Sequence, residues 1–291
     1  MEMDRFTWLS RIYKTTKIMK TFYYLASYFM VLIGLGISQI SMAQNNIKVL
    51  VVQDEMPTVE VLAEFLGHKA KFEVEIVDQA HLPTDMSVYR AVIGYIHGNL
   101  EFPTEKAIIE YTEKGGRYIC LHHSISSGKA RNKFYFDFLG IQLDHPEFSR
   151  HPVKPGEGYG WFHDGENGTM FLLANLNPYH YITNHNINWG PRISYISSDG
   201  PAIEAHYPSI SLPKTEVYMN HKFTDGREKT VLCGLKYYDP RNGEIFMQDR
   251  AVWLKPYGQG TIVYIMPGHT PADYENPNIA QMILNAIVWE Q

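Results

Sequence analysis

Four apolar runs that alternate with helical patterns constrain the fold of this chain more than any other feature. The first, Ile47–Gln53, is almost continuously apolar and rich in β-branched residues, which is typical of a strand buried on both faces of a parallel sheet. The other runs are Phe72–Val77, Arg90–Ile96 and Arg117–Leu121, and apolar residues at helical spacing follow the first and the third run. Because short connections join these segments, the sequence predicts an α/β fold with a doubly wound, mostly parallel sheet.

The middle of the chain lacks this regularity. From about residue 129 to residue 218 it is filled with glycine, proline, asparagine, histidine and aromatic residues. We expect long loop insertions at Gly156–Gly168 and Asn175–Pro191, and long loops in a compact domain are commonly functional rims. Regular patterns return near the C-terminus, with strands predicted at Glu216–Met219, Thr230–Leu235, Ala251–Leu254 and Gly260–Met266 and a helix at about Ile279–Val288.

The N-terminal segment has the three parts of a secretory signal peptide. Basic residues precede an apolar run from Phe22 to Ile37, and the small-residue triplet Ser41-Met42-Ala43 follows, directly before Gln44. The apolar run is shorter than the roughly 20 residues that a membrane span requires. We therefore expect residues 1–43 to be a cleavable signal peptide, and residues 44–291 to be a periplasmic or secreted domain without a stable membrane anchor.

The charge balance bounds the partners of the chain. Removing residues 1–43 takes away five of the 26 Lys and Arg residues and two of the 31 Asp and Glu residues, so the net charge falls from -5 to about -8. An acidic chain without a clustered basic face is not expected to bind nucleic acid. The sequence leaves a homo-oligomer open.

Polar residues follow three of the predicted strands. In a doubly wound sheet, ligands bind beyond the carboxyl ends of the parallel strands, so the side chains at these ends are candidates for substrate binding and catalysis. Here the three ends read Gln53-Asp54, His97-Gly98-Asn99 and His122-His123-Ser124.

One histidine suits the apex of a tight turn from strand to helix. Such a turn requires small residues two positions before and two positions after its apex. His122 meets this condition, because Cys120 and Ser124 flank it, whereas His123 would be flanked by bulky residues. We expect His122 to be a general base or a metal ligand. Strand alternation directs His123 to the opposite face, which favours a structural role over its other candidate role in substrate binding.

Further candidates lie in the second half of the chain. His269 follows a glycine at the end of the last strong strand, and Glu216, Tyr218 and His221 surround another predicted strand. The catalytic candidates are therefore His122, His97, His269 and Glu216, and the substrate-binding candidates include Gln53, Asp54, Asn99, His123, Tyr218 and His221. Histidines with carboxylates are the ligand types of zinc, but the chain has no HExxH or CxxC motif. Zinc or another divalent metal is left open.

Aromatic residues are frequent in the irregular middle segment. Together with asparagine and histidine they make a composition that sugar-binding rims use, because flat apolar platforms and planar hydrogen-bond donors suit a carbohydrate. Trp161 and Trp189 are the candidates for such platforms. The alternative, that these aromatics pack the loops themselves, carries equal weight.

Four short segments, in order along the chain, resemble motifs of the ThuA-like (trehalose utilisation) family. They are Gly115–His122, Thr215–Tyr218, Ala251–Trp253 with Tyr257–Gly260, and Gly268-His269. The resemblance covers about Ile47–Trp289. The chain departs from the family pattern at Thr215, where Asp is usual, and at Thr261, where Arg is usual, and it matches poorly across Gly156–Tyr207.

The resemblance implies a flavodoxin-like fold related to class I glutamine amidotransferases but without their catalytic cysteine. An amidotransferase would need an exposed, reactive Cys120. Cys120 and Cys233 instead lie in apolar strand patterns, and we expect two buried free thiols rather than a disulfide. The resemblance also implies a link to trehalose and related disaccharides, including their 3-keto forms.

These observations lead to one main hypothesis and one alternative. The main hypothesis is an exported protein that acts on a carbohydrate by histidine-based proton transfer or hydrolysis, as a hydrolase, lyase or isomerase. His122 would be the general base, His97 and His269 would orient or polarise the substrate, and Glu216 would act as an acid or fix a histidine tautomer. The alternative is a non-catalytic carbohydrate-binding accessory protein, in which Trp161 and Trp189 carry the affinity.

Overall fold

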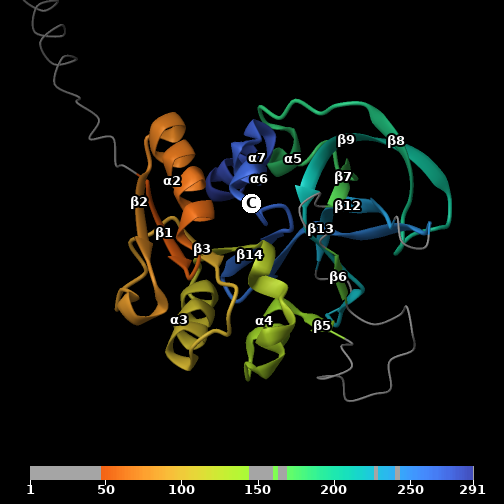
Figure 1. Cartoon of the computed structure of the whole chain (residues 1–291). Helices are drawn as coiled ribbons and strands as arrows, with labels where there is room; N and C mark the ends of the chain where they lie inside the picture. Colours follow the sequence, from red (N-terminus) through yellow and green to blue (C-terminus); the bar gives the residue numbers. More distant parts are fainter. Residues whose placement is uncertain (1–46, 144–159, 163–168, 226–228, 240–242, 291) are drawn as a thin grey trace, which may run out of the picture. The chain divides into compact units, whose positions relative to one another are not determined.

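The computed structural model describes residues 47–143, 160–162, 169–225, 229–239 and 243–290. Its main element is a ten-stranded sheet with the order β2-β1-β3-β4-β14-β13-β12-β7-β9-β8 (Figure 1). The first five strands in this order pair in parallel. They are β2 (Glu73–Val77), β1 (Lys48–Gln53), β3 (Ala91–Tyr95), β4 (Arg117–Leu121) and β14 (Gly260–Ile265). This order is that of a flavodoxin-like sheet, so the predicted α/β fold class is confirmed.

The other half of the sheet is antiparallel. Its strands are β13 (Ile245–Tyr257), β12 (Thr230–Tyr238), β7 (Thr169–Asn175), β9 (Glu204–Thr215) and β8 (Arg192–Ile196). The sheet is therefore mixed, with a parallel core and an antiparallel extension. Three strands of the extension, β7, β8 and β9, lie where the sequence pattern indicated no strand.

Two small antiparallel sheets lie beside the main one. One pairs β10 (Val217–Met219) with β6 (Gly160–Phe162), and the other pairs β11 (His221–Phe223) with β5 (Ile141–Leu143). The loop expected at Gly156–Gly168 thus contains a strand in its described part, and its other residues lie outside the described residues. Between β7 and β8 the chain forms only the short helix α5 (Tyr181–Asn184), in agreement with the long connection expected up to Pro191.

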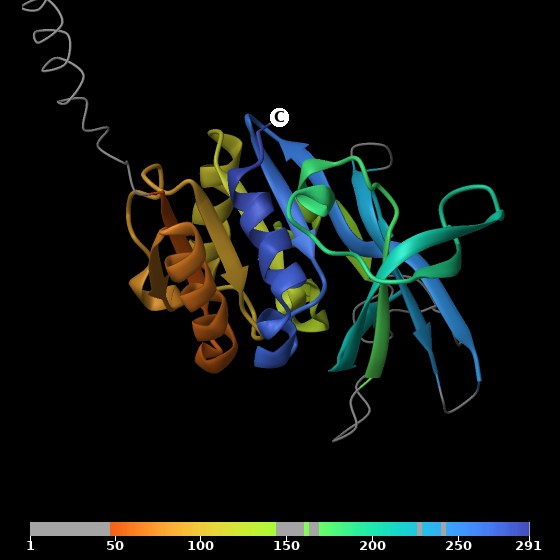
Figure 2. The same cartoon turned by 90° about the horizontal axis from the view of Figure 1, so that it is seen from above.

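Helices cover both faces of the parallel core. On one face, α2 (Met56–Ala70), α6 (Pro271–Glu275) and α7 (Pro277–Val288) pack together, and α5 packs on α7. On the other face, α3 (Phe102–Glu113) packs against β4 and β14, and α4 (Tyr135–Leu139) packs against α3 (Figure 2). Three short 3-10 helices complete the fold: η1 (Gln79–His81), η2 (His122–Ile125) and η3 (Ser127–Arg131). At the carboxyl end of β4 the chain turns directly into η2, and Tyr218 of β10 lies against His122 of that turn.

The hydrophobic core follows the central strands. All six residues of β14 and all five residues of β3 are buried, as expected for strands with helices on both faces. The predicted signal peptide and its cleavage site lie outside the described residues. Within the part of the chain that the structure describes, no helix is both long and apolar enough to cross a membrane.

Candidate functional site

His122 stands at the carboxyl end of β4 in a strained backbone conformation. Its φ angle is 31°, in the left-handed region that residues with a side chain rarely adopt. The small residues two positions before and after it are both bonded to neighbouring strands: the Ser124 hydroxyl donates to the Gly94 carbonyl at 3.1 Å, and the Cys120 thiol donates to the Val263 carbonyl at 3.3 Å. The turn places the imidazole beyond the sheet edge, although the side chain is completely buried.

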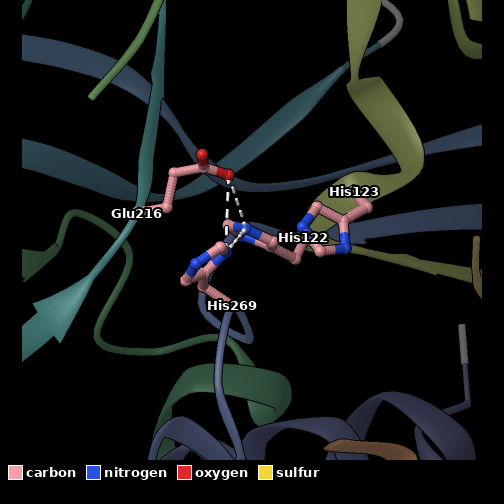
Figure 3. A group of neighbouring side chains, drawn as sticks. All are labelled: His122, His123, Glu216 and His269. Atoms are coloured by element: carbon pink, nitrogen blue, oxygen red, sulfur yellow. Dashed lines mark hydrogen bonds and ion pairs between the residues drawn. The ribbon is translucent and has the colours of Figure 1, made fainter. Parts of the chain in front are cut away.

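Both ring nitrogens of His122 are engaged. Nδ1 lies 2.7 Å from the Met266 carbonyl oxygen, which can only accept, so Nδ1 carries the hydrogen. Nε2 lies 3.0 Å from Glu216 Oε2 and 3.3 Å from His269 Nδ1. Figure 3 shows these side chains converging on one point. Three groups that are distant in sequence therefore meet at one nitrogen atom, and we call Glu216, His122 and His269 the triad.

Glu216 reaches the triad from the short connection between β9 and β10. It is 7% exposed, and its Oε2 lies 3.6 Å from His269 Nδ1. Burial raises the pKa of this carboxyl, but the hydrogen bond from His122, the charge of His122 and a hydrogen bond from Tyr218 outweigh it and lower the pKa below its ordinary value. The Tyr218 ring lies 4.9 Å from the His122 ring. Glu216 is thus held as a carboxylate.

His269 is positioned by its backbone. The preceding Gly268 has a φ of 138°, which a residue with a side chain would adopt only under strain, and its carbonyl accepts from the Tyr95 hydroxyl at 2.8 Å. The Asp273 carboxylate accepts from the His269 backbone N–H at 2.8 Å and from the Thr215 hydroxyl at 2.6 Å. Asp273 therefore fixes His269 and the residue before Glu216 at the same time.

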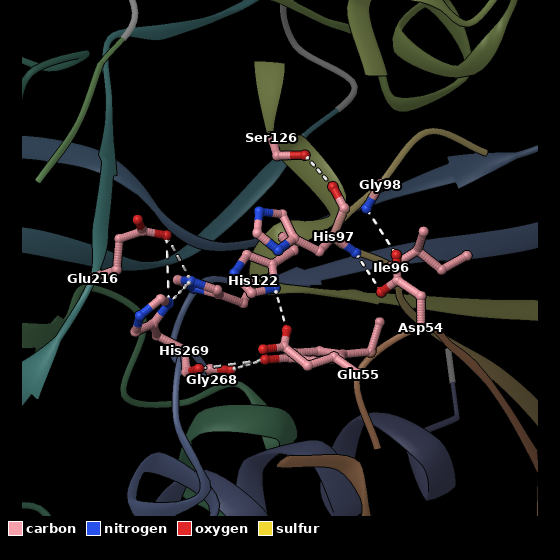
Figure 4. A network of polar contacts seen from close by, with 12 residues as sticks. Asp54, Glu55, Ile96, His97, Gly98, His122, Ser126, Glu216, Gly268 and His269 are labelled. Atoms are coloured by element: carbon pink, nitrogen blue, oxygen red, sulfur yellow. Dashed lines mark hydrogen bonds and ion pairs between the residues drawn. The ribbon is translucent and has the colours of Figure 1, made fainter. Parts of the chain in front are cut away.

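A second group of side chains lies next to the triad. Figure 4 shows two of them, His97 and Glu55. The His97 ring stacks on the His123 ring with centroids 4.4 Å apart, and His123 Nδ1 lies 3.4 Å from Glu55 Oε2. His123 also contacts His122, at 4.4 Å between centroids. The expectation that His123 points to the opposite face is wrong, because β4 ends at Leu121 and the 3-10 turn η2 replaces strand alternation. Burial, followed by the charge of His122, lowers the pKa of His123, which is therefore neutral.

Two charged residues brace the loops that carry these histidines. The Asp54 carboxylate accepts from the backbone N–H groups of His97 and Gly98 at 2.7 and 2.8 Å. The buried Lys129 ammonium donates to the carbonyls of Ile96 and His123 at 2.6 and 2.7 Å. Burial lowers the pKa of Lys129 to about 7. Asp54 is thus a structural brace, and Lys129 ties the end of β3 to the turn after β4.

The remaining candidates occupy different surroundings. Gln53 is buried at the end of β1, and its Oε1 has no hydrogen-bond partner among the described residues. Asn99 is exposed, and its carbonyl accepts from Gln79. His221 is buried, and its ring packs against Phe223 and Tyr264 rather than against the triad. The structure thus brings neither Asn99 nor His221 into direct contact with the triad.

The two tryptophans differ. Trp161 is 48% exposed and lies on β6 directly opposite Tyr218 of β10, close to the triad. Trp189 is half-buried, and its indole N–H donates to the Thr183 carbonyl at 2.7 Å. Trp189 therefore packs its own loop, whereas Trp161 has an exposed side chain and lies opposite Tyr218.

Three contributors to the site were missed at the level of sequence. Glu55 follows Gln53-Asp54 at the end of the first strand, so its position was a usable signal. Asp273 lies in a Thr270–Asp273 capping box, a pattern that indicates a helix start rather than a brace. Lys129 carried no signal, because nothing in its sequence neighbourhood indicates burial.

Cys120 is not placed as a nucleophile. Its side chain is fully buried in β4, and burial raises the pKa of its thiol well above the ordinary value. Cys233, in β12, is likewise buried, and both cysteines are free thiols. The chemistry of the site is therefore that of histidine and carboxylate side chains.

Comparisons with known proteins give one family and several similar structures. A family model described as ThuA, trehalose utilisation, matches residues 46–290. A ThuA-like protein from Bacteroides uniformis is 17% identical, with a TM-score of 0.50 over 84% of this chain and 90% of that one, which shows a common fold. A β-galactosidase from Rahnella sp. R3 is 13% identical over 82% of this chain but 30% of its own, with a TM-score of 0.48. A glutamine amidotransferase from Thermotoga maritima is 10% identical over 84% of this chain and 96% of its own, with a TM-score of 0.45. No curated protein sequence matches significantly.

Proposed function

This chain belongs to the ThuA family of trehalose-utilisation proteins, and we propose that it is an enzyme that converts a 3-keto-disaccharide. The observation that carries the proposal is the convergence of the triad at the carboxyl edge of the parallel sheet, with His97 and Glu55 beside it. Buried histidines and a carboxylate brought together from distant parts of a chain are costly to fold, and such clusters concentrate at functional sites.

The structure supports a different division of roles among the histidines than the one expected from sequence. His122 is completely buried and both its ring nitrogens are engaged, so it does not offer a free base to a substrate. His97 is exposed and stands at the same edge, where Asp54 holds its backbone. We assign general-base catalysis to His97 and polarisation of the substrate to the triad.

The chemistry of a keto-sugar suits this arrangement. A ketone at C3 makes the hydrogen on C2 acidic, so His97 would accept that proton while the electron pair forms an enolate with negative charge on the ketone oxygen. In a 3-keto-disaccharide the glycosidic oxygen on C1 is β to the ketone. The enolate would then expel it, the C1–O bond would break, and the departing oxygen would take the proton from His97. The products are an unsaturated keto-sugar and a free sugar.

The surroundings of the cluster offer a surface for a sugar ring. Trp161 and Tyr218 lie opposite each other on β6 and β10, and Tyr218 contacts His122. Trp161 is the more exposed of the two, and an aromatic face with nearby polar groups suits a pyranose ring. Trp161 would therefore contribute affinity without taking part in proton transfer.

The test is a product screen of the purified protein with trehalose, its 3-keto form and a panel of other disaccharides, read by mass spectrometry. We expect turnover of a keto form, and a loss of about 10³-fold in kcat for His97→Asn. The matched control is His206→Asn, because His206 is an exposed histidine on β9. Full activity of His97→Asn would refute the base assignment. Sugar binding without any product would favour the non-catalytic accessory protein.

We also propose that the protein is exported, because residues 1–43 have the composition and order of a signal peptide. The N-terminal sequence of the protein recovered from the periplasm or medium of a Gram-negative host is expected to begin at Gln44. Recovery of only full-length protein in the cytosol would contradict export.

A further inference from the structure

We propose that the triad binds a divalent cation, best suited to zinc, through His122 Nε2, Glu216 Oε2 and His269 Nδ1. The three donor atoms belong to side chains from η2, the β9–β10 connection and the loop after β14. The binding of the ion stands on geometry alone, and only its role in turnover rests on the proposed function.

The distances between the donor atoms match a zinc coordination sphere. Zinc lies about 2.0–2.2 Å from nitrogen and oxygen ligands in tetrahedral geometry, which places two ligand atoms about 3.3–3.6 Å apart. The three separations in the triad are 3.0, 3.3 and 3.6 Å. Two of them fall in this range and the third is about 0.3 Å shorter, so an ion could be bound with shifts of only a few tenths of an ångström.

The hydrogen bond of His122 Nδ1 directs the other ring nitrogen at the triad. Because Nδ1 donates to the Met266 carbonyl, Nε2 is the nitrogen that faces Glu216 and His269 and that a metal ion would use. Nε2 lies 3.0 Å from Glu216 Oε2, and the hydrogen on Nε2 occupies the position that a bound cation would take. A histidine whose second nitrogen donates to a backbone carbonyl is a recurrent feature of zinc sites, because that hydrogen bond orients the ring.

The three ligands are held by further hydrogen bonds. Asp273 fixes the His269 backbone and Thr215, and a hydrogen bond from Tyr218 reaches Glu216. Such partners raise metal affinity by orienting the ligands before the ion binds. The triad is therefore preorganised rather than assembled from mobile side chains.

The ligand set distinguishes between cations and between kinds of site. Two imidazoles and one carboxylate suit zinc, whereas magnesium and calcium prefer oxygen ligands. The three ligands of the triad leave one tetrahedral position for a substrate, as in catalytic zinc sites, and His123 lies close by, with a ring nitrogen within 4.8 Å of the three donor atoms. A ketone oxygen bound there would be polarised by the ion. The Glu216 carboxylate alone would repel an enolate, so the cation also resolves an electrostatic difficulty of the proposed reaction.

The test is metal binding by the full chain after treatment with a chelator and dialysis. Titration calorimetry with Zn²⁺ is expected to give one ion per chain, and Co²⁺ is expected to give the visible absorption of a tetrahedral site. Glu216→Gln and His269→Asn should each weaken zinc binding by about 100-fold or more, because each removes one of three ligands. His206→Asn is the matched histidine control and should bind zinc as the unaltered chain does.

Each outcome decides the proposal. Absence of zinc binding, or unchanged binding by both Glu216→Gln and His269→Asn, would overturn it. Circular dichroism and thermal unfolding show whether each variant folds, and since Glu216→Gln is nearly isosteric, it decides the matter if His269→Asn does not fold. Zinc binding without turnover of any keto-sugar would leave the site standing and remove the proposed function. Turnover of a keto-sugar without any zinc binding would support the proposed function and overturn the zinc site.

Discussion

The two halves of the main sheet contribute unequally to the candidate site. The parallel half presents Glu55, His97, His122 and His269 at or just beyond the carboxyl ends of β1, β3, β4 and β14. The antiparallel half contributes Glu216, in the connection that leaves β9, and Thr215, the last residue of β9, which donates to Asp273. The parallel edge thus supplies most of the loops that carry the cluster, while the antiparallel extension adds the carboxylate that joins His122 and His269.

The carboxylate that the antiparallel half contributes can be removed by a single substitution, and we expect this change to have the largest effect. Glu216→Gln keeps the shape of the side chain but removes its charge, so we expect kcat on a keto-sugar to fall by about 10²–10³-fold. The melting temperature should change little, because the substitution leaves packing intact. The control is Glu204→Gln, an exposed residue of β9. Unchanged turnover in Glu216→Gln would show that the parallel half is sufficient by itself.

A second test lowers the stability of the parallel half by removing Lys129, which is buried next to the site. Lys129→Met removes the ammonium that donates to the carbonyls of Ile96, Gly98 and His123, and leaves these groups without that donor. Each unsatisfied buried polar group costs about 1–3 kcal/mol, so the free energy of unfolding should fall by about 3 kcal/mol or more. Denaturant titration measures this, with Lys106→Met on the exposed face of α3 as the control. Equal stability of the two variants would show that Lys129 is dispensable.

Substitution of the two tryptophans should have different effects, because Trp161 is exposed on β6 whereas Trp189 packs inside its own loop. Trp161→Ala should raise the KM for a keto-sugar about tenfold, equivalent to about 1.4 kcal/mol, with little effect on stability. Trp189→Ala should instead lower the free energy of unfolding by about 2 kcal/mol and leave KM unchanged, because its indole packs the loop and bonds to Thr183. A reversed pattern would place the sugar on the α5 side of the molecule.

The smallest expected effect concerns the cysteines, one in each half. Cys120 lies in β4 and Cys233 in β12, and burial raises the pKa of both thiols. A maleimide probe should label neither residue in the native protein and both after unfolding. Selective labelling of Cys233 under native conditions would show that the antiparallel half opens locally while the parallel half stays closed.

The parallel half could be predicted from sequence because its signals are local. Its strands are short apolar runs buried on both faces, and each is followed by a turn or a helix. The strands β7, β8 and β9 gave no such signal, since the burial of β8 and β9 is uneven and β7 pairs with β9 and β12, which are distant from it in sequence. Their strand character is set by partners, which a single sequence does not display.

The candidate site was predictable where a strand end marked it. His97, His122 and His269 each follow a buried strand, and the small flanks of His122 indicated the turn that its φ angle shows. The orientation of His123 was not predictable, because it depends on where β4 ends and η2 begins. Trp161 and Trp189 looked alike in sequence, and their difference arises from the packing of the loops around them.

The left-handed backbone of His122 means that stability and the candidate site favour different residues at this position. Glycine or asparagine would relieve the strain at a φ of 31°, while only a histidine supplies the imidazole on which Glu216 and His269 converge. A lineage that no longer needed the reaction would gain stability by losing this side chain. On the proposed function, we expect histidine at this position in relatives that retain the activity, and glycine or asparagine in relatives that keep the fold for another purpose.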